Sequence, residues 1–252
     1  MRLKNKIAIV TGAGTGIGRG IAERFGREGA SVVIAEIDPG SGDAAAKSIR
    51  DSGGDAFFVQ ADVSDEAQVK AVMQGALERY GKIDILCNNA AVLLIHQEAR
   101  AHELTNETWD RTMAVNLRGY WLCSKYVIPA MLGTRAGSII HIASPTGLFG
   151  FTRLTAYSTS KGGVVGLMRA MAADYAPDNI RVNAIVPGTI DTPMNAALLS
   201  APEMRQRFAD LAPARRLGTA EDLAGIAVFL ASEDSSYCVG GIFTVDGGLT
   251  AV

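Results

Sequence analysis

The chain has 252 residues, of which 48% are hydrophobic and 20% are charged, with a net charge of −2. This length provides enough apolar residues for one sizeable core, while the near-neutral balance and the lack of a basic run disfavour nucleic acid and anionic membranes as partners. Three widely spaced cysteines without a pairing motif indicate reduced thiols in a cytoplasmic protein. No apolar run is long enough to span a membrane. The three histidines lack the spacing of a zinc site, so we expect no metal site.

Short β-branched runs alternate with longer helical patterns along the chain. Strands are predicted at Ile7–Thr11, Ser31–Glu36, Ala56–Gln60, Ile83–Cys87, Ser138–Ile142, Arg181–Val186 and Phe243–Val245. Helices are predicted near residues 17–29, 41–52, 65–80, 106–132, 156–176 and 220–231. Most of the strand runs are almost continuously apolar, which is typical of parallel strands covered on both faces. The alternation predicts an α/β fold with a doubly wound, mostly parallel sheet of seven strands, helices on both faces, and a single domain over residues 1–252.

Residues 189–219 interrupt this alternation. They have no strand pattern, but among their polar residues they carry Met194, Leu198, Leu199, Met204 and Phe208. A long excursion in a compact domain is often a functional lid over the substrate. An ordinary surface helix with one apolar face would give the same pattern, and the sequence leaves both interpretations open.

A glycine-rich turn follows the first predicted strand. Gly12, Gly16 and Gly18 lie between that strand and the first predicted helix, with the spacing Gly-x-x-x-Gly-x-Gly. Glycines permit a tight turn and let backbone N–H groups approach a pyrophosphate at the N-terminus of the helix, where the helix dipole favours anions. The position between strand and helix predicts a dinucleotide site in preference to a turn without a ligand.

An acidic residue at the end of the second strand predicts which dinucleotide binds. Glu36 lies 18 residues beyond Gly18, and a carboxylate there can accept hydrogen bonds from both hydroxyls of the adenosine ribose. It would repel a 2′-phosphate, and neither Thr15 nor Ile37 offers a basic side chain to offset that repulsion. We therefore expect NAD over NADP, the alternative being that Glu36 is a solvated acid at a strand end.

A tyrosine and a lysine four residues apart suggest proton transfer. Tyr157 and Lys161 would share one face of a helix, one turn apart. A free phenol has a pKa of about 10, and a neighbouring ammonium group favours the phenolate and lowers that pKa. Such a pair suits proton exchange with an alcohol or a carbonyl group. The spacing is also common on helix surfaces, so it gains meaning only beside the other landmarks.

With the glycine-rich turn near its start, Asn88-Asn89-Ala90-Ala91 after the fourth strand and Tyr157 with Lys161 in its second half, the whole chain resembles the short-chain dehydrogenase/reductase family. The resemblance implies a Rossmann-type fold and a catalytic set formed by Asn116, Ser144, Tyr157 and Lys161. It implies cofactor contacts from Gly12, Thr15, Gly16, Ile17, Gly18, Glu36, Ile37, Asp62, Val63, Asn89, Ala90, Ala91, Tyr157, Lys161, Pro187, Gly188, Ile190 and Thr192.

The same resemblance implies a division of labour. Tyr157, as phenolate, removes the proton from a substrate hydroxyl while hydride passes from the same carbon to the nicotinamide. Ser144 holds the substrate oxygen, and Lys161 lowers the pKa of Tyr157 and bonds the nicotinamide ribose. Asn116 supports Lys161 through water and backbone.

The predicted function is hydride transfer between NAD(H) and a secondary alcohol or ketone. Ser144, Tyr157 and Phe151 are expected to contact the substrate. An apolar pocket, which favours a hydrophobic substrate, would be formed by Val92, Leu93, Leu94, Phe149, Phe151, Met194 and Leu199, unless these residues belong to the core. His96 or Arg100 is a further candidate for a polar substrate group, unless both are simply solvated.

Two other functions stay open: an NADP-dependent carbonyl reductase of the β-ketoacyl type, and a protein that binds dinucleotide without turnover. The resemblance also implies a homo-oligomer, commonly a tetramer formed through two long central helices. Small residues that would permit close helix approach are Gly162, Gly163, Gly166 and Ala170, although they would equally allow packing within one subunit.

Overall fold

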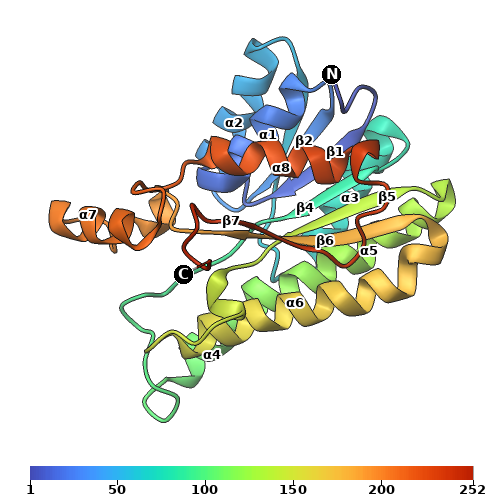
Figure 1. Ribbon diagram of the computed structural model, residues 1–252. Coiled ribbons are helices and arrows are strands. Elements are labelled where there is room, and N and C mark those ends of the chain that lie inside the picture. Colours follow the sequence, from blue (N-terminus) through green and yellow to red (C-terminus); the bar gives the residue numbers. More distant parts are fainter. Residues whose placement is uncertain (252) are drawn as a thin grey trace.

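A seven-stranded parallel sheet forms the centre of the computed structural model, which describes residues 1–251 (Figure 1). The strands are β1 (Ile7–Thr11), β2 (Ser31–Glu36), β3 (Asp55–Gln60), β4 (Ile85–Asn88), β5 (Gly137–Ile142), β6 (Ile180–Pro187) and β7 (Ile242–Val245). Their order in the sheet is β3-β2-β1-β4-β5-β6-β7, and every pair is parallel. The predicted doubly wound sheet is confirmed, with strand ends that differ by no more than two residues.

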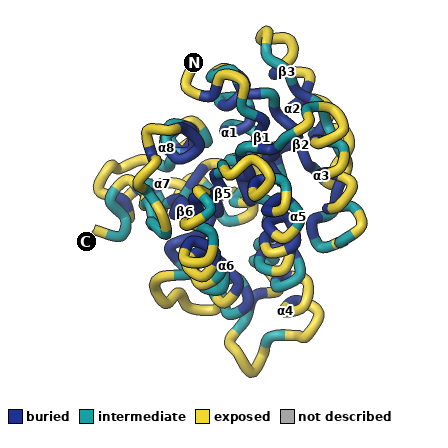
Figure 2. The backbone as a smooth tube through the Cα atoms, turned by 90° about the vertical axis from the view of Figure 1, so that its right-hand side faces the viewer, coloured by how far each residue is buried: buried dark blue, intermediate teal, exposed yellow. Residues whose placement is uncertain are grey.

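Helices cover both faces of the sheet because successive side chains of a strand point to opposite sides. Ala8 and Val10 of β1 pack under α1 (Gly16–Arg27), α2 (Pro39–Asp51) and α8 (Ala220–Ala231). Ile9 of the same strand packs under α3 (Glu66–Tyr80), α5 (Gly119–Thr134) and α6 (Thr155–Tyr175). Figure 2 shows the buried strands and inner helix faces enclosed by exposed turns.

The predicted helix over 106–132 is interrupted. It consists of α4 (Asn106–Met113), a π-helical turn over Ala114–Arg118, and α5. The wider turn carries Asn116, one of the predicted catalytic residues. A π-turn within an α-helix often occurs at a functional site, because it rotates one side chain out of the regular spacing.

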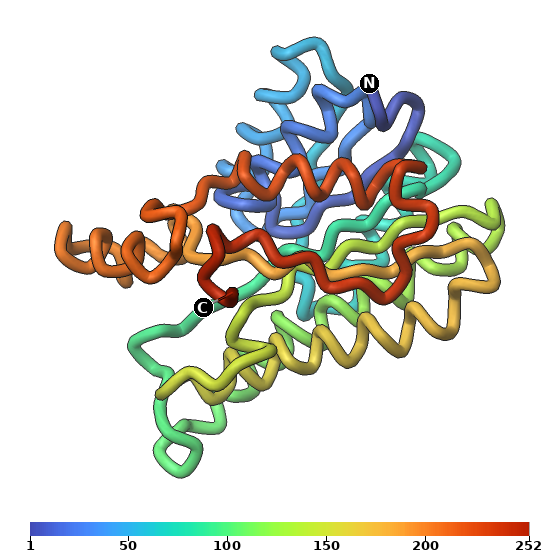
Figure 3. Tube along the Cα trace, in the orientation of Figure 1, coloured from blue at the N-terminus to red at the C-terminus, as the bar shows by residue number. Residues whose placement is uncertain are grey.

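The segment 189–219 contains a short 3₁₀ turn at Pro193–Asn195 and helix α7 (Pro202–Leu211), and it returns to the sheet through a bridge between Ile190 and Gly218. Figure 3 shows α7 projecting from the molecule on the side where the C-terminal turn also lies. Within residues 1–251, no helix is long and apolar enough to cross a membrane.

Candidate functional site

The carboxyl ends of the strands open into one continuous cleft. A cavity of about 410 Å³ lies over the glycine-rich turn, and a second of about 470 Å³ lies over the ends of β5 and β6. The two cavities share the lining residues Ile17, Asn89, Ala91, Leu93, Thr192 and Met194. In parallel α/β sheets this edge is where ligands bind.

The glycine-rich turn has the close packing that a dinucleotide site requires. Gly12 has φ +61°, and a Cβ there would lie 2.7 Å from the Cα of Ala90. Gly18 packs so closely on Gly12 O and Asn89 Nδ2 that a side chain would overlap them. Asn89 Nδ2 donates to Thr11 O and Gly12 O, both at 3.0 Å, and fixes the shape of the turn.

The N-terminus of α1 fits an anionic group. Thr15 is the N-cap residue, yet its side chain does not bond the first turn, and that turn contains no acidic residue. The first backbone N–H groups of a helix need acceptors, and the helix dipole favours a negative one. The turn and this helix end therefore fit the pyrophosphate of a dinucleotide.

Glu36 is held at the rim of the first cavity by backbone N–H groups. Its Oε2 accepts from Gly14 N at 3.0 Å, and its Oε1 accepts from Ile37 N at 2.8 Å and Asp38 N at 3.2 Å. The carboxylate also lines the cavity. Its position is thus set by the chain itself, so it would meet a ligand without rearrangement.

Asp62 lines the same cavity and carries a partner that the sequence analysis missed. Its Oδ1 accepts from the backbone and hydroxyl of Ser64, at 2.8 and 2.6 Å, and its Oδ2 accepts from both terminal nitrogens of Arg111 at 3.2 Å. Burial raises the pKa of Asp62, but the Ser64 and Arg111 contacts outweigh it and leave the pKa lowered. Arg111 itself lines the cavity.

Most of the predicted cofactor contacts lie along the cleft. Twelve line the first cavity: Gly12, Thr15, Gly16, Ile17, Glu36, Ile37, Asp62, Val63, Asn89, Ala90, Ala91 and Thr192. The second cavity adds Tyr157, Lys161, Pro187, Gly188 and Ile190. Gly18 lines neither cavity, because it is buried under the turn. Ala91, where the family motif has glycine, does not adopt a positive φ, so the substitution introduces no strain.

Ser144 reaches the second cavity from a turn that packs tightly on α6. The 3₁₀ turn Pro145–Gly147 follows it, and a Cβ on Gly147 would lie 2.6 Å from the carbonyl carbon of Lys161. Thr146 donates to Ser144 Oγ from its backbone N at 3.3 Å and from its hydroxyl at 3.0 Å. Because these contacts use the acceptor side of Ser144, its hydroxyl proton can be donated, and it is shared with the Tyr157 side chain at the cavity.

Burial sets the pKa values of Tyr157 and Lys161. Tyr157 is partly exposed to the cavity, but burial of its ring raises the pKa of the phenol to about 12. The hydrogen bond from Ser144 lowers this pKa, and the charge of Glu98 raises it. Lys161 is 1% exposed, and burial lowers the pKa of its amine to about 7. The expectation that Lys161 brings the Tyr157 pKa down is therefore not met by the groups of the protein alone.

The Lys161 amine is anchored from behind. Its Nζ donates to Ile142 O at 2.7 Å and to the Tyr120 hydroxyl at 3.3 Å. The Tyr120 ring stacks on His141, whose Nδ1 lies 3.1 Å from Asn88 Nδ2. Tyr120, His141 and Asn88 are all fully buried, and sequence reasoning had assigned no role to Tyr120 or His141.

Asn116 makes its direct contacts with the backbone of Val92 and with Ser160. Its Oδ1 accepts from Val92 N at 2.8 Å, and its Nδ2 donates to Val92 O at 2.9 Å and to Ser160 Oγ at 3.2 Å. The side chain thus connects the segment after β4 to α6. Asn116 lines neither cavity, so its side chain fixes the frame of the site.

The predicted apolar pocket is only partly formed by the expected residues. Leu93, Phe151 and Met194 line the second cavity, while Val92 and Leu94 line the first. Leu199 is 3% exposed and lines neither cavity, and Phe149 is exposed to solvent. The second cavity instead gains Ile95, Leu154, Leu198, Phe208 and Leu249, and its charged residues are Glu98, Arg153 and Lys161. His96 and Arg100 are exposed and do not line it.

Comparison with known proteins identifies the family. Residues 12–250 match a family model described as enoyl-(acyl carrier protein) reductase. The chain is 44% identical to the uncharacterized oxidoreductase YxbG of Bacillus subtilis, over 99% of this chain and 93% of the relative. It is 39% identical to cis-4-hydroxycyclohexanecarboxylate dehydrogenase of Sinomonas cyclohexanicum, over 98% of this chain and 97% of the relative.

The chain belongs to the short-chain dehydrogenase/reductase family. It is an NAD(P)-dependent oxidoreductase that acts on alcohols or ketones. A similar solved structure, with TM-score 0.93 and 38% identity over 99% of this chain and 98% of that one, is a putative NAD(P)-dependent gluconate 5-dehydrogenase from Beutenbergia cavernae with bound NADP. Relatives of this chain thus include proteins seen with NADP, and the family alone does not decide between the two cofactors.

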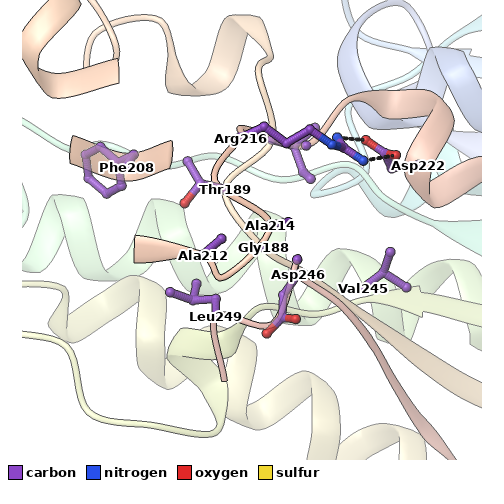
Figure 4. A pocket seen from close by; sticks show the side chains of 13 residues that line it. Gly188, Thr189, Phe208, Ala212, Ala214, Arg216, Asp222, Val245, Asp246 and Leu249 are labelled. Carbon is purple, nitrogen blue, oxygen red and sulfur yellow. Dashed lines mark hydrogen bonds and ion pairs between the residues drawn. The ribbon is translucent and has the colours of Figure 1, made fainter. Parts of the chain in front are cut away.

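A smaller cavity of about 120 Å³ extends this dehydrogenase/reductase cleft beneath the 189–219 segment (Figure 4). It shares Gly188, Thr189, Ile190, Phe208 and Leu249 with the second cavity. Figure 4 shows the Arg216 guanidinium paired with the Asp222 carboxylate, with nitrogen–oxygen distances of 2.7 and 2.8 Å. This pair fastens the end of the segment to the first turn of α8.

Proposed function

We propose that the protein is an NAD-preferring dehydrogenase of secondary alcohols, reversible toward ketones, with Ser144, Tyr157 and Lys161 as catalytic residues and Asn116 as their support. The observation that carries the proposal is that these three side chains line an apolar cavity continuous with the glycine-rich cleft. A protein that only bound the dinucleotide would not need a serine held by hydrogen bonds, Ser144, and a buried amine, Lys161, beside that cleft.

Each residue has a role that its contacts support. Tyr157 removes the proton of the substrate hydroxyl, and Ser144 donates a hydrogen bond to the substrate oxygen as charge develops on it. Lys161, held by Ile142 O and Tyr120, adds positive charge beside the phenol. Bound NAD supplies the hydride acceptor and the positive charge of its nicotinamide ring. Tyr157→Phe is expected to bind NAD as the wild type does while losing nearly all turnover, and wild-type turnover in this variant would contradict the role of Tyr157.

The preference for NAD is inferred from Glu36. A carboxylate already bound by three backbone N–H groups cannot turn away from a ligand without losing them, so a 2′-phosphate would face its charge. We expect kcat/KM with NAD to exceed that with NADP by about tenfold or more, since about 1.4 kcal/mol of repulsion already gives that ratio. A preference for NADP would favour the alternative function, an NADP-dependent carbonyl reductase. The similar structure with bound NADP is consistent with that alternative.

The substrate is proposed to be a largely hydrophobic secondary alcohol that contacts Phe151. A relative is named for an alcohol on a saturated ring that also bears a carboxylate, and the second cavity of this chain has Arg153 among its apolar residues. A panel of cyclic and open-chain secondary alcohols should therefore contain each compound with and without a carboxylate. NAD reduction followed by absorbance tests turnover and ranks the substrates in one experiment.

Two structural proposals accompany this function. The segment 189–219 acts as the substrate lid of a single catalytic domain, since its Met194, Leu198 and Phe208 line the cavity. The subunits form a homotetramer through α5 and α6. Gly162 and Gly163 pack inside the subunit, where a Cβ would meet Gly147 O at 3.5 Å or Leu117 at 2.7 Å, whereas Gly166 has open space around it.

A further inference from the structure

Helix α6, which carries Tyr157, begins without a capping side chain of its own. Leu154 occupies the N-cap position and makes no side-chain hydrogen bond to the first turn. The N–H groups of that turn therefore need another acceptor, because a buried unpaired N–H group costs free energy. Serine, threonine, aspartate or asparagine would normally supply it locally.

The acceptor is a carboxylate that lies 58 residues earlier in the chain. Glu98 Oε2 accepts from Ala156 N at 3.1 Å, and Glu98 Oε1 accepts from the backbone N of Tyr157 itself at 2.7 Å. These are the second and third residues of α6, whose N–H groups a capping side chain usually bonds. Glu98 is only 7% exposed, and a negative charge is also favoured there by the helix dipole.

The loop that carries Glu98 is fastened to the same helix turn by a neighbouring contact. The hydroxyl of Thr155 donates to Ala99 O at 2.8 Å. On the other side, the Thr108 hydroxyl of α4 donates to the side-chain oxygen of Gln97 at 3.1 Å. Ile95 and Glu98 of this loop line the second cavity together with Ser144 and Tyr157.

We propose that Glu98 is a positioning residue of the catalytic site, a cap supplied from the cavity loop that holds the first turn of α6 and so sets the distance between Tyr157 and Ser144. The proposal rests on the proposed function for its kinetic consequences. Its structural part, the capping of α6, stands on the hydrogen bonds alone. Through this cap, a change in the loop after β4 is transmitted directly to the catalytic tyrosine.

The charge of Glu98 should affect the pKa of Tyr157, an effect that a purely structural cap would lack. Ser144 after β5 and Glu98 act directly on the ionisation of Tyr157, and Tyr120 on α5 interacts with it electrostatically. The charged residues Lys161, one turn along α6, and Arg153, before α6, line the same cavity. Among them the Glu98 charge raises the pKa of Tyr157. Removing that charge should therefore lower the pKa and make the phenolate available at lower pH.

Two substitutions separate the cap from the charge. Glu98→Gln keeps one carbonyl acceptor but removes the charge, and Glu98→Ala removes both. Glu107→Gln is the matched control, since it removes the same charge from an exposed position in the first turn of α4. Amide hydrogen exchange at Ala156 and Tyr157 is measured without substrate, and kcat, KM and their pH dependence are measured with the best alcohol of the panel.

In Glu98→Ala the two amides should exchange about tenfold faster, as expected for loss of a helix cap, and kcat should fall more than KM changes. In Glu98→Gln the acid limb of the kcat/KM profile should move to lower pH, while Glu107→Gln should match the wild type in every measurement. Unchanged exchange at both amides in Glu98→Ala would overturn the cap, and an unshifted acid limb in Glu98→Gln would overturn its influence on Tyr157. If the wild type itself turned over no alcohol, the proposed function would fail, while the exchange measurement would still decide the cap.

Discussion

The contact between Gly147 and α6 makes the alignment of the catalytic residues testable without altering any of them. In Gly147→Ala the new Cβ would lie 2.6 Å from the carbonyl carbon of Lys161, 2.7 Å from its oxygen and 2.8 Å from Gly162 N. Ordinary contacts begin near 3.4 Å, so the turn after Ser144 and the backbone of α6 must separate by about 0.8 Å. A backbone contact of this kind cannot be relieved by a side-chain rotation.

The size of the effect follows from that displacement. A misplacement of about 1 Å costs about a hundredfold in rate, so kcat of Gly147→Ala should fall by about thirty- to a hundredfold. Overpacking should cost about 1–3 kcal/mol of stability and lower the melting temperature by a few degrees. The affinity for NAD, measured by calorimetry, should stay within about twofold, because most of the predicted cofactor contacts lie away from this turn.

The facing residue supplies the control. A Cβ on Gly162 would meet only Gly147 O, at 3.5 Å, which is an ordinary contact. Gly162→Ala should therefore keep kcat and, as a glycine replaced within a helix, should melt at or slightly above the wild-type temperature. If both variants kept wild-type turnover, the spacing of Ser144 from Tyr157 would not depend on this contact, and the reasoning would be refuted.

Three further changes test the buried groups and the assembly. Arg181→Met removes hydrogen bonds to Leu230 O at 2.8 Å and Ser235 O at 3.2 Å, and should lower the free energy of unfolding, measured in urea, by about 3 kcal/mol. A decrease below about 1 kcal/mol would contradict a stabilising role of Arg181. Burial, and then the charge of Lys161, lowers the pKa of His141 to about 3, below its unfolded value of about 6.5, so the wild type should lose about 2 kcal/mol between pH 6.5 and 4.5 as the unfolded chain takes up the proton. His141→Asn should lack that part of the loss. If the subunits form the proposed tetramer, Gly166→Ala should shift it toward smaller species in light scattering, and an assembly of unchanged size would exclude close helix approach at this position.

The sheet could be predicted because its strands are apolar on both faces. Residues such as Ile9 and Val10 leave no alternation of polar and apolar side chains, and this pattern belongs to parallel strands between helix layers. The π-turn at Ala114–Arg118 escaped prediction because its hydrogen bonds span only one residue more than those of an α-helix, and five residues carry no pattern that reports so small a change. Residue composition alone made one continuous helix the better prediction.

Site residues that stand in short sequence motifs could be predicted. Site residues whose role depends on a partner far away in the sequence were missed. Ser144 and Lys161 stand in motifs, but Glu98 lies in a polar loop, and its burial depends on a helix end 58 residues later. Tyr120 escaped for a similar reason, since a tyrosine within an apolar helix is first interpreted as core. The sequence did not point to a distant cap either, because the helix predicted from residue 156 would follow Thr155, an ordinary capping residue, whereas in the structure Thr155 is already helical and Leu154 is the N-cap.

The pKa values of the buried pair determine when the site can act. Burial holds the pKa of Tyr157 at about 12 and that of Lys161 at about 7, so near neutral pH the phenol keeps its proton and the amine carries only part of its charge. The negative charge of Glu98 works in the same direction on Tyr157. If Tyr157 is the base, as proposed, additional positive charge in the cleft would favour removal of a substrate proton, and the ring of an oxidised nicotinamide cofactor would supply such a charge, which the reduced ring lacks. In the proposed mechanism, proton removal by Tyr157 would thus be favoured only when a hydride acceptor is present in the cleft.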